Sequence, residues 1–291
     1  MSKNLKVVRK FDPWKNPWCT CPEKYTLNPY TGCAHGCRYC YISAFIPHAF
    51  ELREKAQIIA RVEHDFSQIT KLDTYLSLSN SSDPYPPREK EREITRKIII
   101  LAQKYQIPIL ILTKSDLVAR DQDLLKNMPA AVSITLTTLE EDLAHQLEPN
   151  APSPAKRIEA IKALALAGIP VMVRIDPIIL GINHQPETWK KMVEAVSPWV
   201  YQVTASTFKP RPDSWQRVAQ TFSQTTKFRQ LYSEKKGNSW YLREKLRETL
   251  LTSLKELVNQ KNLPFATCRE GMPELNDTTC DGSGILYHSS V

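Results

Sequence analysis

The sequence predicts an α/β protein, a partial (β/α)6-type TIM-like barrel with a helical C-terminal extension. Short runs of β-branched and apolar residues recur through the first two-thirds of the 291-residue chain. Amphipathic helical patterns lie between these runs, and strands that alternate with helices in this way form parallel sheets covered by the helices. The pattern changes after Lys209, where Pro210 and Pro212 interrupt the chain and further helical segments follow.

The predicted strands are nearly continuous apolar runs, as expected for strands that are buried on both faces. A first strand near residues 25–30 leads into a loop rich in cysteine. Five more are predicted at residues 74–79, 108–113, 132–137, 169–175 and 200–205. About six strand–helix units suit a partial or complete barrel, whose active site lies at the carboxyl ends of the strands.

The helices are predicted from periodicity and end signals. Residues 88–105 place Ile94, Ile98 and Leu101 on one face. Residues 154–167 follow Ser153, a favourable N-cap, and precede Gly168, a favourable end residue. Residues 240–258 carry a stripe of leucines, which predicts an amphipathic helix in the extension.

These patterns divide the chain into three predicted parts. Residues 1–24 form an N-terminal extension that carries Cys19 and Cys21, and residues 25–208 form the barrel core. Residues 209–291 form a basic helical extension and a tail that contains Cys268 and Cys280.

The extension carries most of the net charge of +8, because residues 209–261 hold twelve Lys/Arg against five Asp/Glu. It also contains five aromatic residues, Trp215, Phe228, Tyr232, Trp240 and Tyr241. Basic and aromatic residues together are typical of a surface that grips a nucleic-acid backbone and stacks on bases. The alternative, which we favour, is a pair of amphipathic helices with solvated basic faces and buried aromatics, because a basic composition alone is a weak indicator.

Composition indicates a soluble protein, with 42% hydrophobic and 24% charged residues. The longest apolar runs, such as residues 98–102, are too short to span a bilayer. The first five residues show no apolar signal-peptide core. We therefore expect a cytoplasmic protein with no membrane partner.

Three of the seven cysteines, Cys33, Cys37 and Cys40, stand in a CxxxCxxC pattern. Clustered thiols in a reducing compartment more often bind metal than form disulfides. Thiolates are the preferred ligands of iron–sulfur clusters, and three ligands leave one iron of a four-iron cluster free to bind another molecule. A zinc site is the alternative, but zinc usually takes two close pairs of ligands, and His35 lies between the first two cysteines.

The wider context of this loop, NPYTGCAHGCRYCY at residues 28–41, resembles the signature of the radical S-adenosylmethionine (SAM) enzymes. More closely, it resembles the branch related to spore photoproduct lyase, often labelled DNA repair photolyase-like. Further stretches are similar to that branch in the same order, namely DPYP at 83–86, TKS at 113–115, RD at 120–121, residues 148–157, AGIP at 167–170 and DPII at 176–179. The resemblance covers about residues 25–203.

The resemblance implies a [4Fe-4S] cluster on Cys33, Cys37 and Cys40, with SAM on the free iron. The implied SAM contacts follow motif position. Tyr39 would lie near the adenine, Asn80 near the methionine amine, Lys114 and Ser115 near the carboxylate and the ribose, and Arg174 near the carboxylate as well. An electron donor of the flavodoxin or ferredoxin type is also implied.

The other four cysteines, Cys19, Cys21, Cys268 and Cys280, are the right number for a second metal site. A second fully ligated iron–sulfur cluster and a structural zinc ion are both open. The chain ends would have to meet, as termini often do. Unrelated free thiols, with Cys268 buried in a strand at residues 264–268, are the simpler alternative.

The expected function is radical SAM chemistry of a lyase or transferase type on an unidentified substrate, with nucleic acid as one candidate. True spore photoproduct repair is disfavoured, because the lesion-repair member of the branch returns hydrogen from a cysteine downstream of the cluster. This chain has no cysteine between Cys40 and Cys268, and neither Tyr85, Tyr201 nor a tail cysteine is singled out as a substitute. The alternative from another class is a non-catalytic, metal-stabilised nucleic-acid-binding protein.

Overall fold

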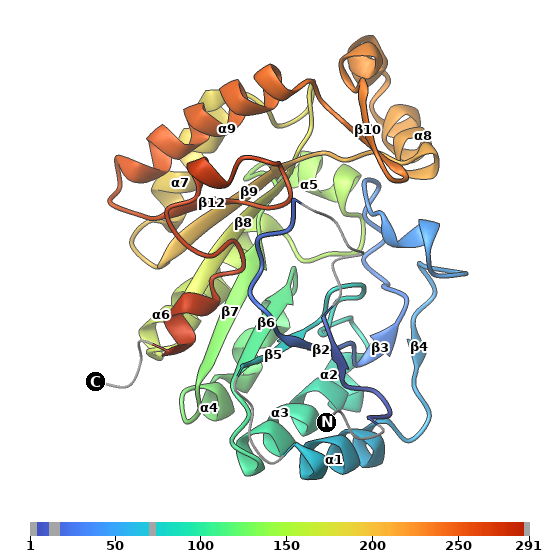
Figure 1. Cartoon of the computed structure of the whole chain (residues 1–291), viewed down its shortest axis with the longest axis vertical. Helices are drawn as coiled ribbons and strands as arrows, with labels where there is room; N and C mark the ends of the chain where they lie inside the picture. Colours follow the sequence, from blue (N-terminus) through green and yellow to red (C-terminus); the bar gives the residue numbers. More distant parts are fainter. Residues whose placement is uncertain (1–4, 12–17, 70–73, 288–291) are drawn as a thin grey trace.

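A twisted, mostly parallel sheet runs through the centre of the chain, with helices packed on its outer face (Figure 1). The computed structural model describes residues 5–11, 18–69 and 74–287. Eight strands of the described residues form this sheet in the order β1-β2-β5-β6-β7-β8-β9-β12. Only β1 pairs antiparallel, and every other neighbouring pair is parallel. The predicted α/β fold of the partial-barrel type is confirmed.

All six predicted strands are present in the sheet. They are β2 (Tyr25–Leu27), β5 (Leu76–Leu78), β6 (Ile109–Thr113), β7 (Ala130–Thr135), β8 (Val171–Ile178) and β9 (Gln202–Thr207). The sheet is completed by β1 (Arg9–Lys10) and β12 (Phe265–Thr267). Two small two-stranded sheets are formed by β3 (Tyr30–Thr31) with β4 (Arg53–Glu54) and by the hairpin of β10 (Glu234–Lys236) with β11 (Ser239–Tyr241).

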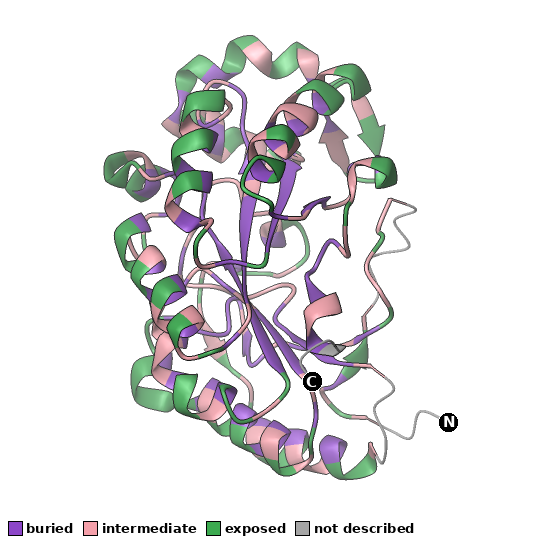
Figure 2. Cartoon of the chain, turned by 90° about the vertical axis from the view of Figure 1, so that its left-hand side faces the viewer, coloured by how far each residue is buried: buried purple, intermediate pink, exposed green. Residues whose placement is uncertain are grey.

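The helices follow the predicted periodicity, with differences at their ends. The α-helices are α1 (Ile58–Gln68), α2 (Glu89–Arg92), α3 (Ile94–Lys104), α4 (Gln122–Leu125), α5 (Glu141–Leu147), α6 (Pro154–Leu166), α7 (Pro186–Val196), α8 (Pro212–Thr221) and α9 (Glu244–Asn259). Short 3-10 helices are η1 (Ile42–Ala44), η2 (Asp116–Asp121), η3 (Ser223–Leu231), η4 (Pro273–Leu275) and η5 (Ser283–Tyr287). The central strands β5 to β9 and β12 are almost entirely buried, while the helices turn exposed faces outward (Figure 2).

Two predicted helices differ in detail from the observed ones. The helix predicted at residues 88–105 is split into α2 and α3 at Glu93, whose φ of 54° lies in the left-handed region. The helix predicted from residue 240 begins at Glu244, because residues 239–241 pair in a hairpin instead. Ser153 caps α6 as predicted, accepting a hydrogen bond from the Lys156 amide.

The C-terminal tail returns to the barrel and fills its concave side. Strand β12 pairs with β9 at the sheet edge, and η5 then packs beside β7 (Figure 1). Leu286 joins an inner cluster with Tyr75, Leu110, Ala131 and Met172, all of which are buried. The tail therefore takes the place of the side chains that fill the centre of a closed barrel. The predicted division of the chain at residues 24 and 208 stays a prediction.

The aromatic residues of the basic extension pack together in a second apolar cluster. Tyr232 is buried there, and Trp215, Phe228 and Trp240 pack against it, while Tyr241 is also buried. Tyr232 and Tyr241 are therefore core residues, while Trp215, Phe228 and Trp240 stay partly exposed at the edge of the cluster. Within the described residues, no helix has the length and apolar character needed to cross a membrane.

Candidate active site

All seven cysteines line one cavity of about 280 Å³ at the carboxyl ends of the parallel strands. The loop after β2 supplies Cys33, Cys37 and Cys40, and the loops after β5 and β6 supply Asn80 and Lys114. This is the end of a parallel barrel at which active sites are found. The structure thus brings the predicted metal ligands and most of the predicted SAM contacts to one place.

The cysteine loop is fixed by backbone contacts and by a glycine. The Cys33 amide donates to the Ala49 carbonyl at 2.8 Å, and the Cys40 amide donates to the Cys37 carbonyl at 3.1 Å. Gly32 has a φ of +75°, and a Cβ added there would lie 2.2 Å from the Glu51 carbonyl oxygen. Only glycine permits this approach of the two backbone segments.

The thiols of this loop are poorly solvated. Burial raises the pKa of Cys33 to about 12, and burial also raises the pKa of Cys37 and of Cys40. Thiolates at such a site need nearby positive charge, which a bound metal supplies while displacing the thiol protons. Three sulfur donors on one buried loop therefore fit a cluster that is ligated by three cysteines.

Tyr39 is positioned by the buried ion pair of Glu148 and Arg157. Its hydroxyl donates to Glu148, and Glu148 lies 2.6 Å from the Arg157 guanidinium. Burial alone would raise the pKa of Glu148, but the charges of Arg157 and Lys114 and the Tyr39 hydroxyl hold it below its ordinary value. The Tyr39 ring is thereby fixed beside the cluster loop.

Lys114 brings a positive charge close to this loop, in addition to Arg217, which donates to the Cys40 carbonyl at 2.6 Å. Its ammonium group lies 5.5 Å from the centre of the Tyr39 ring. Burial alone would lower the pKa of Lys114, but Cys37 and Glu148 raise it to about 12. Lys114 is therefore protonated at neutral pH and faces the cluster loop as a cation.

Asp83 and His35 form a second anchor that motif-based reasoning missed. The His35 Nε2 lies 3.3 Å from Asp83, and the Thr113 hydroxyl and the Lys114 amide donate to Asp83 at 2.7 and 2.8 Å. Burial alone would raise the pKa of Asp83, but His35, Thr113 and the Lys114 amide lower it to about 2. The available signal was the DPYP motif, in which this aspartate follows a buried strand.

The predicted SAM contacts differ in how they meet the cavity. Asn80 lines it and is oriented by a hydrogen bond from its amide nitrogen to the Thr26 hydroxyl. Ser115 is buried and caps η2, accepting a hydrogen bond from the Leu117 amide at 3.3 Å, and it is not among the residues that line the cavity. Arg174 lines the cavity but pairs with Asp176 at 2.8 Å.

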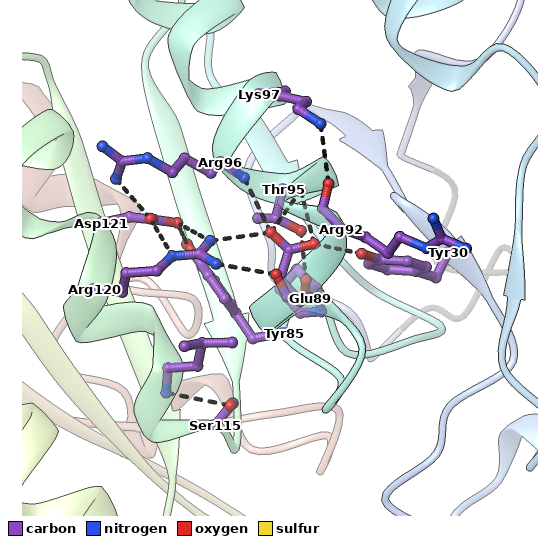
Figure 3. A network of polar contacts seen from close by, with 12 residues as sticks. Tyr30, Tyr85, Glu89, Arg92, Thr95, Arg96, Lys97, Ser115, Arg120 and Asp121 are labelled. Carbon is purple, nitrogen blue, oxygen red and sulfur yellow. Dashed lines mark hydrogen bonds and ion pairs between the residues drawn. The ribbon is translucent and has the colours of Figure 1, made fainter.

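A polar network behind the cavity explains two further motifs (Figure 3). Tyr85 donates to Asp121 at 3.0 Å, and Arg120 lies 2.8 Å from Asp121 and 3.1 Å from Glu89. Tyr30 donates to Glu89 from the strand beside the cysteine loop. These buried contacts join the segments that follow β5 and β6, so Tyr85 holds the scaffold rather than facing the cavity. Tyr201 is 55% exposed at the start of β9.

The four other cysteines are also brought together. Cys21 and Cys280 place their sulfur atoms 3.3 Å apart, Cys19 is hydrogen-bonded to Cys21, and Cys268 to Cys280. Hydrogen bonding to Cys280, followed by the charges of Arg174 and Arg269, lowers the pKa of Cys268 to about 6. In the described part of the chain, no three His, Cys, Asp or Glu side chains already surround one point as metal ligands.

Comparison with known families decides the superfamily. The model of the radical SAM superfamily matches residues 27–196, which is more than half of the chain. The chain belongs to the radical SAM superfamily. Members of this superfamily use a [4Fe-4S] cluster and SAM, and the three thiols and the adjoining cavity fit that pair of cofactors.

The relatives in this superfamily include proteins of unassigned activity. An uncharacterized protein of Methanocaldococcus jannaschii is 34% identical over 178 residues, which cover 60% of this chain and 66% of that protein. An uncharacterized protein of Mycobacterium bovis is 27% identical over 181 residues, which cover 57% of this chain and 53% of that protein. The matched segment is thus between half and two-thirds of these radical SAM relatives.

Solved radical SAM structures share the fold. Spore photoproduct lyase complexed with dinucleoside spore photoproduct superposes with a TM-score of 0.66 at 14% identity, covering 91% of this chain and 79% of that chain. The SuiB protein of Streptococcus suis, bound to SAM, gives a TM-score of 0.59 at 16% identity, covering 88% and 53%. At these identities the likeness concerns the fold alone.

Proposed function

We propose that Cys33, Cys37 and Cys40 hold the [4Fe-4S] cluster of this radical SAM enzyme and that SAM binds in the adjoining cavity. The observation that carries this proposal is the meeting of the three thiols with Asn80 and Lys114 in one cavity at the strand ends. When bound, cluster and SAM together supply a 5′-deoxyadenosyl radical by one-electron cleavage of the sulfonium.

The chain's own residues would orient the cofactors and exclude water. Lys114, protonated and half-buried at the cavity, is suited to a carboxylate. The backbone carbonyl of Asn80 accepts a hydrogen bond from the Tyr41 hydroxyl, and the Asn80 side-chain amide donates to the Thr26 hydroxyl. These contacts fix the segment after β5, whose carbonyl oxygens could accept hydrogen bonds from an ammonium group. Tyr39 presents its ring face beside the same space.

The substrate side of the cavity favours an anionic substrate. Arg211 lines it, and among the described residues its Nε and Nη1 atoms are buried without a hydrogen-bond partner. Burial and the neighbouring charge of Arg269 lower the pKa of Arg211, as expected where two cations converge. A phosphate group would satisfy these donors. We therefore propose a nucleic acid or nucleotide as substrate, in a reaction of the lyase or transferase type.

The proposed setting is the reducing cytoplasm, with a flavodoxin- or ferredoxin-type protein as electron donor. All seven cysteines are free thiols. In a reducing cytoplasm disulfides are rare, so the cysteines stay reduced and available as cluster ligands.

Anaerobic reconstitution tests the cofactor assignment. Wild-type protein is expected to bind about four irons on Cys33, Cys37 and Cys40, and to release 5′-deoxyadenosine from SAM under dithionite. Cys37→Ala should lose all detectable 5′-deoxyadenosine, while Tyr201→Phe, an exposed control, should match wild type. Cleavage of SAM by Cys37→Ala, or its absence from wild-type protein with a full cluster, would contradict the proposal.

Binding of a single-stranded oligonucleotide to the SAM-loaded protein tests the substrate class. Fluorescence anisotropy should show affinity that falls steeply with salt, because phosphate contacts release counterions. Arg211→Met should weaken binding about tenfold, which corresponds to the loss of about 1.4 kcal/mol from one phosphate contact. Arg92→Met, at an exposed arginine paired with Glu54, is the matched control. Equal binding of the oligonucleotide by Arg211→Met and Arg92→Met would contradict a nucleic-acid substrate in this cavity.

A further inference from the structure

The four cysteines outside the CxxxCxxC loop come from three separate segments. Cys19 and Cys21 precede β2, Cys268 directly follows β12, and Cys280 lies in the tail that fills the barrel. Cys21 and Cys280 place their sulfurs 3.3 Å apart, and Cys19 and Cys268 line the same cavity beside them. Four thiols separated this widely in sequence line the same cavity.

Several independent contacts enforce this meeting. The Cys268 amide donates to the Ala205 carbonyl at 3.0 Å, which extends the pairing of β12 with β9. The Cys280 carbonyl accepts from the Thr204 hydroxyl at 3.0 Å. One residue later, Asp281 pairs with Lys24 at 2.6 Å, and that ion pair is almost completely buried. The tail cysteine is thus tied both to the sheet and to the N-terminal segment.

The spacing of the sulfurs indicates which metal would fit. A tetrahedral zinc site with Zn–S bonds of about 2.3 Å separates its sulfurs by about 3.8 Å. The 3.3 Å between Cys21 and Cys280 is close to that edge length. A cluster of several irons, by contrast, stands between its ligands and holds their sulfurs farther apart. The close approach of Cys21 and Cys280 therefore favours one ion, because a polynuclear cluster would have to push this pair apart.

We propose that Cys19, Cys21, Cys268 and Cys280 bind a single zinc ion, separate from the radical cluster. The ion would join the N-terminal segment, the end of β12 and the tail, closing the gap between the two edges of the sheet. It would also fix the wall of the cavity to which Arg174 and Arg269 belong. Its role is to hold the substrate side of the cavity in shape.

The surrounding charges suit a metal bound by four thiolates, which carries a net charge of −2. Arg174 donates to the Cys280 carbonyl at 3.4 Å, Arg269 directly follows Cys268, and Lys24 pairs with Asp281 next to Cys280. Since the described residues contain no three ligands already placed around one point, loading requires the thiols to turn from one another toward a common centre. Each thiol then exchanges its proton for the metal.

Cobalt binding tests the site without any contribution from the radical cluster. The variant Cys33→Ala/Cys37→Ala/Cys40→Ala is titrated anaerobically with Co²⁺ as full-length protein. Four-thiolate cobalt gives intense visible d–d bands and a sulfur-to-metal charge-transfer band. The expected result is saturation at one Co²⁺ per chain, about a one-to-one ratio, with loss of the bands on adding Zn²⁺.

Two further variants on this background make the test specific. Cys21→Ser/Cys280→Ser should lose the charge-transfer intensity and bind Co²⁺ at least tenfold more weakly, while Thr20→Ala, at an exposed residue between two ligands, should bind as before. If the serine variant does not fold, the zinc that a mercurial reagent releases from the wild-type protein gives the number of metal ions bound per chain. A protein without zinc, a disulfide between Cys21 and Cys280, or iron with sulfide in the three-alanine variant each overturns the proposal.

Discussion

The carboxylate of Glu148 lies 2.6 Å from the guanidinium of Arg157, and neither side chain is more than 1% exposed. The pair stands directly beneath the cysteine loop, because Glu148 also accepts the hydroxyl of Tyr39. Arg157 is fixed further by donating to the Pro152 and Thr135 carbonyls at 2.9 and 3.1 Å. A buried pair of this kind positions Tyr39 more than it adds net stability.

Breaking this pair from one side should be costly. Glu148→Gln leaves the Arg157 charge buried without its partner, so we expect a loss of about 3–5 kcal/mol in the free energy of unfolding. Glu148→Gln/Arg157→Met removes both charges and should recover part of that loss. Urea unfolding of the anaerobic proteins, followed by circular dichroism, measures both. A double variant that is less stable than Glu148→Gln alone would contradict the pairing argument.

Lys114 should tune the reduction potential of the cluster. Reduction adds one negative charge close to a half-buried cation, so Lys114 stabilises the reduced state. Lys114→Met should therefore lower the midpoint potential by about 60 mV, a tenfold change for one electron. Redox titration followed by electron paramagnetic resonance measures it, with Lys190→Met, at an exposed lysine of α7, as control. An unchanged or higher potential in Lys114→Met would show that its charge is screened from the cluster.

Gly32 should be essential for the shape of the cysteine loop. Gly32→Ala places a Cβ 2.2 Å from the Glu51 carbonyl oxygen, and backbone must move to relieve it. We expect the iron content after reconstitution to fall at least severalfold. Gly168→Ala is the matched control, because Gly168 has a similar φ of +77° but open space around it. That variant should cost only about 1–2 kcal/mol of conformational strain and keep its iron. Equal iron content in both variants would refute this role.

Asp83 should stabilise the fold in a pH-dependent way. Its pKa of about 2 lies below the ordinary value of 3.8, so its contribution is present above about pH 4 and is lost as the pH falls toward 2. Asp83→Asn should be less stable than wild type by about 2 kcal/mol at pH 5, given 1.36 kcal/mol per pKa unit. The difference should shrink between pH 4 and pH 2. Urea unfolding midpoints of both proteins at several pH values measure this. A stability difference that does not change with pH would show that it does not arise from ionisation of Asp83.

Local pattern was enough to predict the strands, most helices and the cysteine loop. Strands β5, β6, β7 and β8 are mostly apolar runs that are buried on both faces, so the run itself indicates the structure. The interruption at Glu93 was not predictable, because the helical periodicity continues on both sides of it. Ser115 was expected to contact SAM from its place at a strand end, but its hydroxyl caps η2. Its role as a SAM contact stays a prediction.

The sequence by itself determined that Cys33, Cys37 and Cys40 share one loop, because they stand within eight residues of one another. Only the tertiary structure decided what surrounds that loop. Glu148 and Arg157 meet beneath it, Asp83 binds His35 beside it, and the tail carries Cys280 back to Cys21. Contacts between residues far apart in the chain depend on how the sheet curves and where its edges end. No local pattern in the sequence encodes those distances.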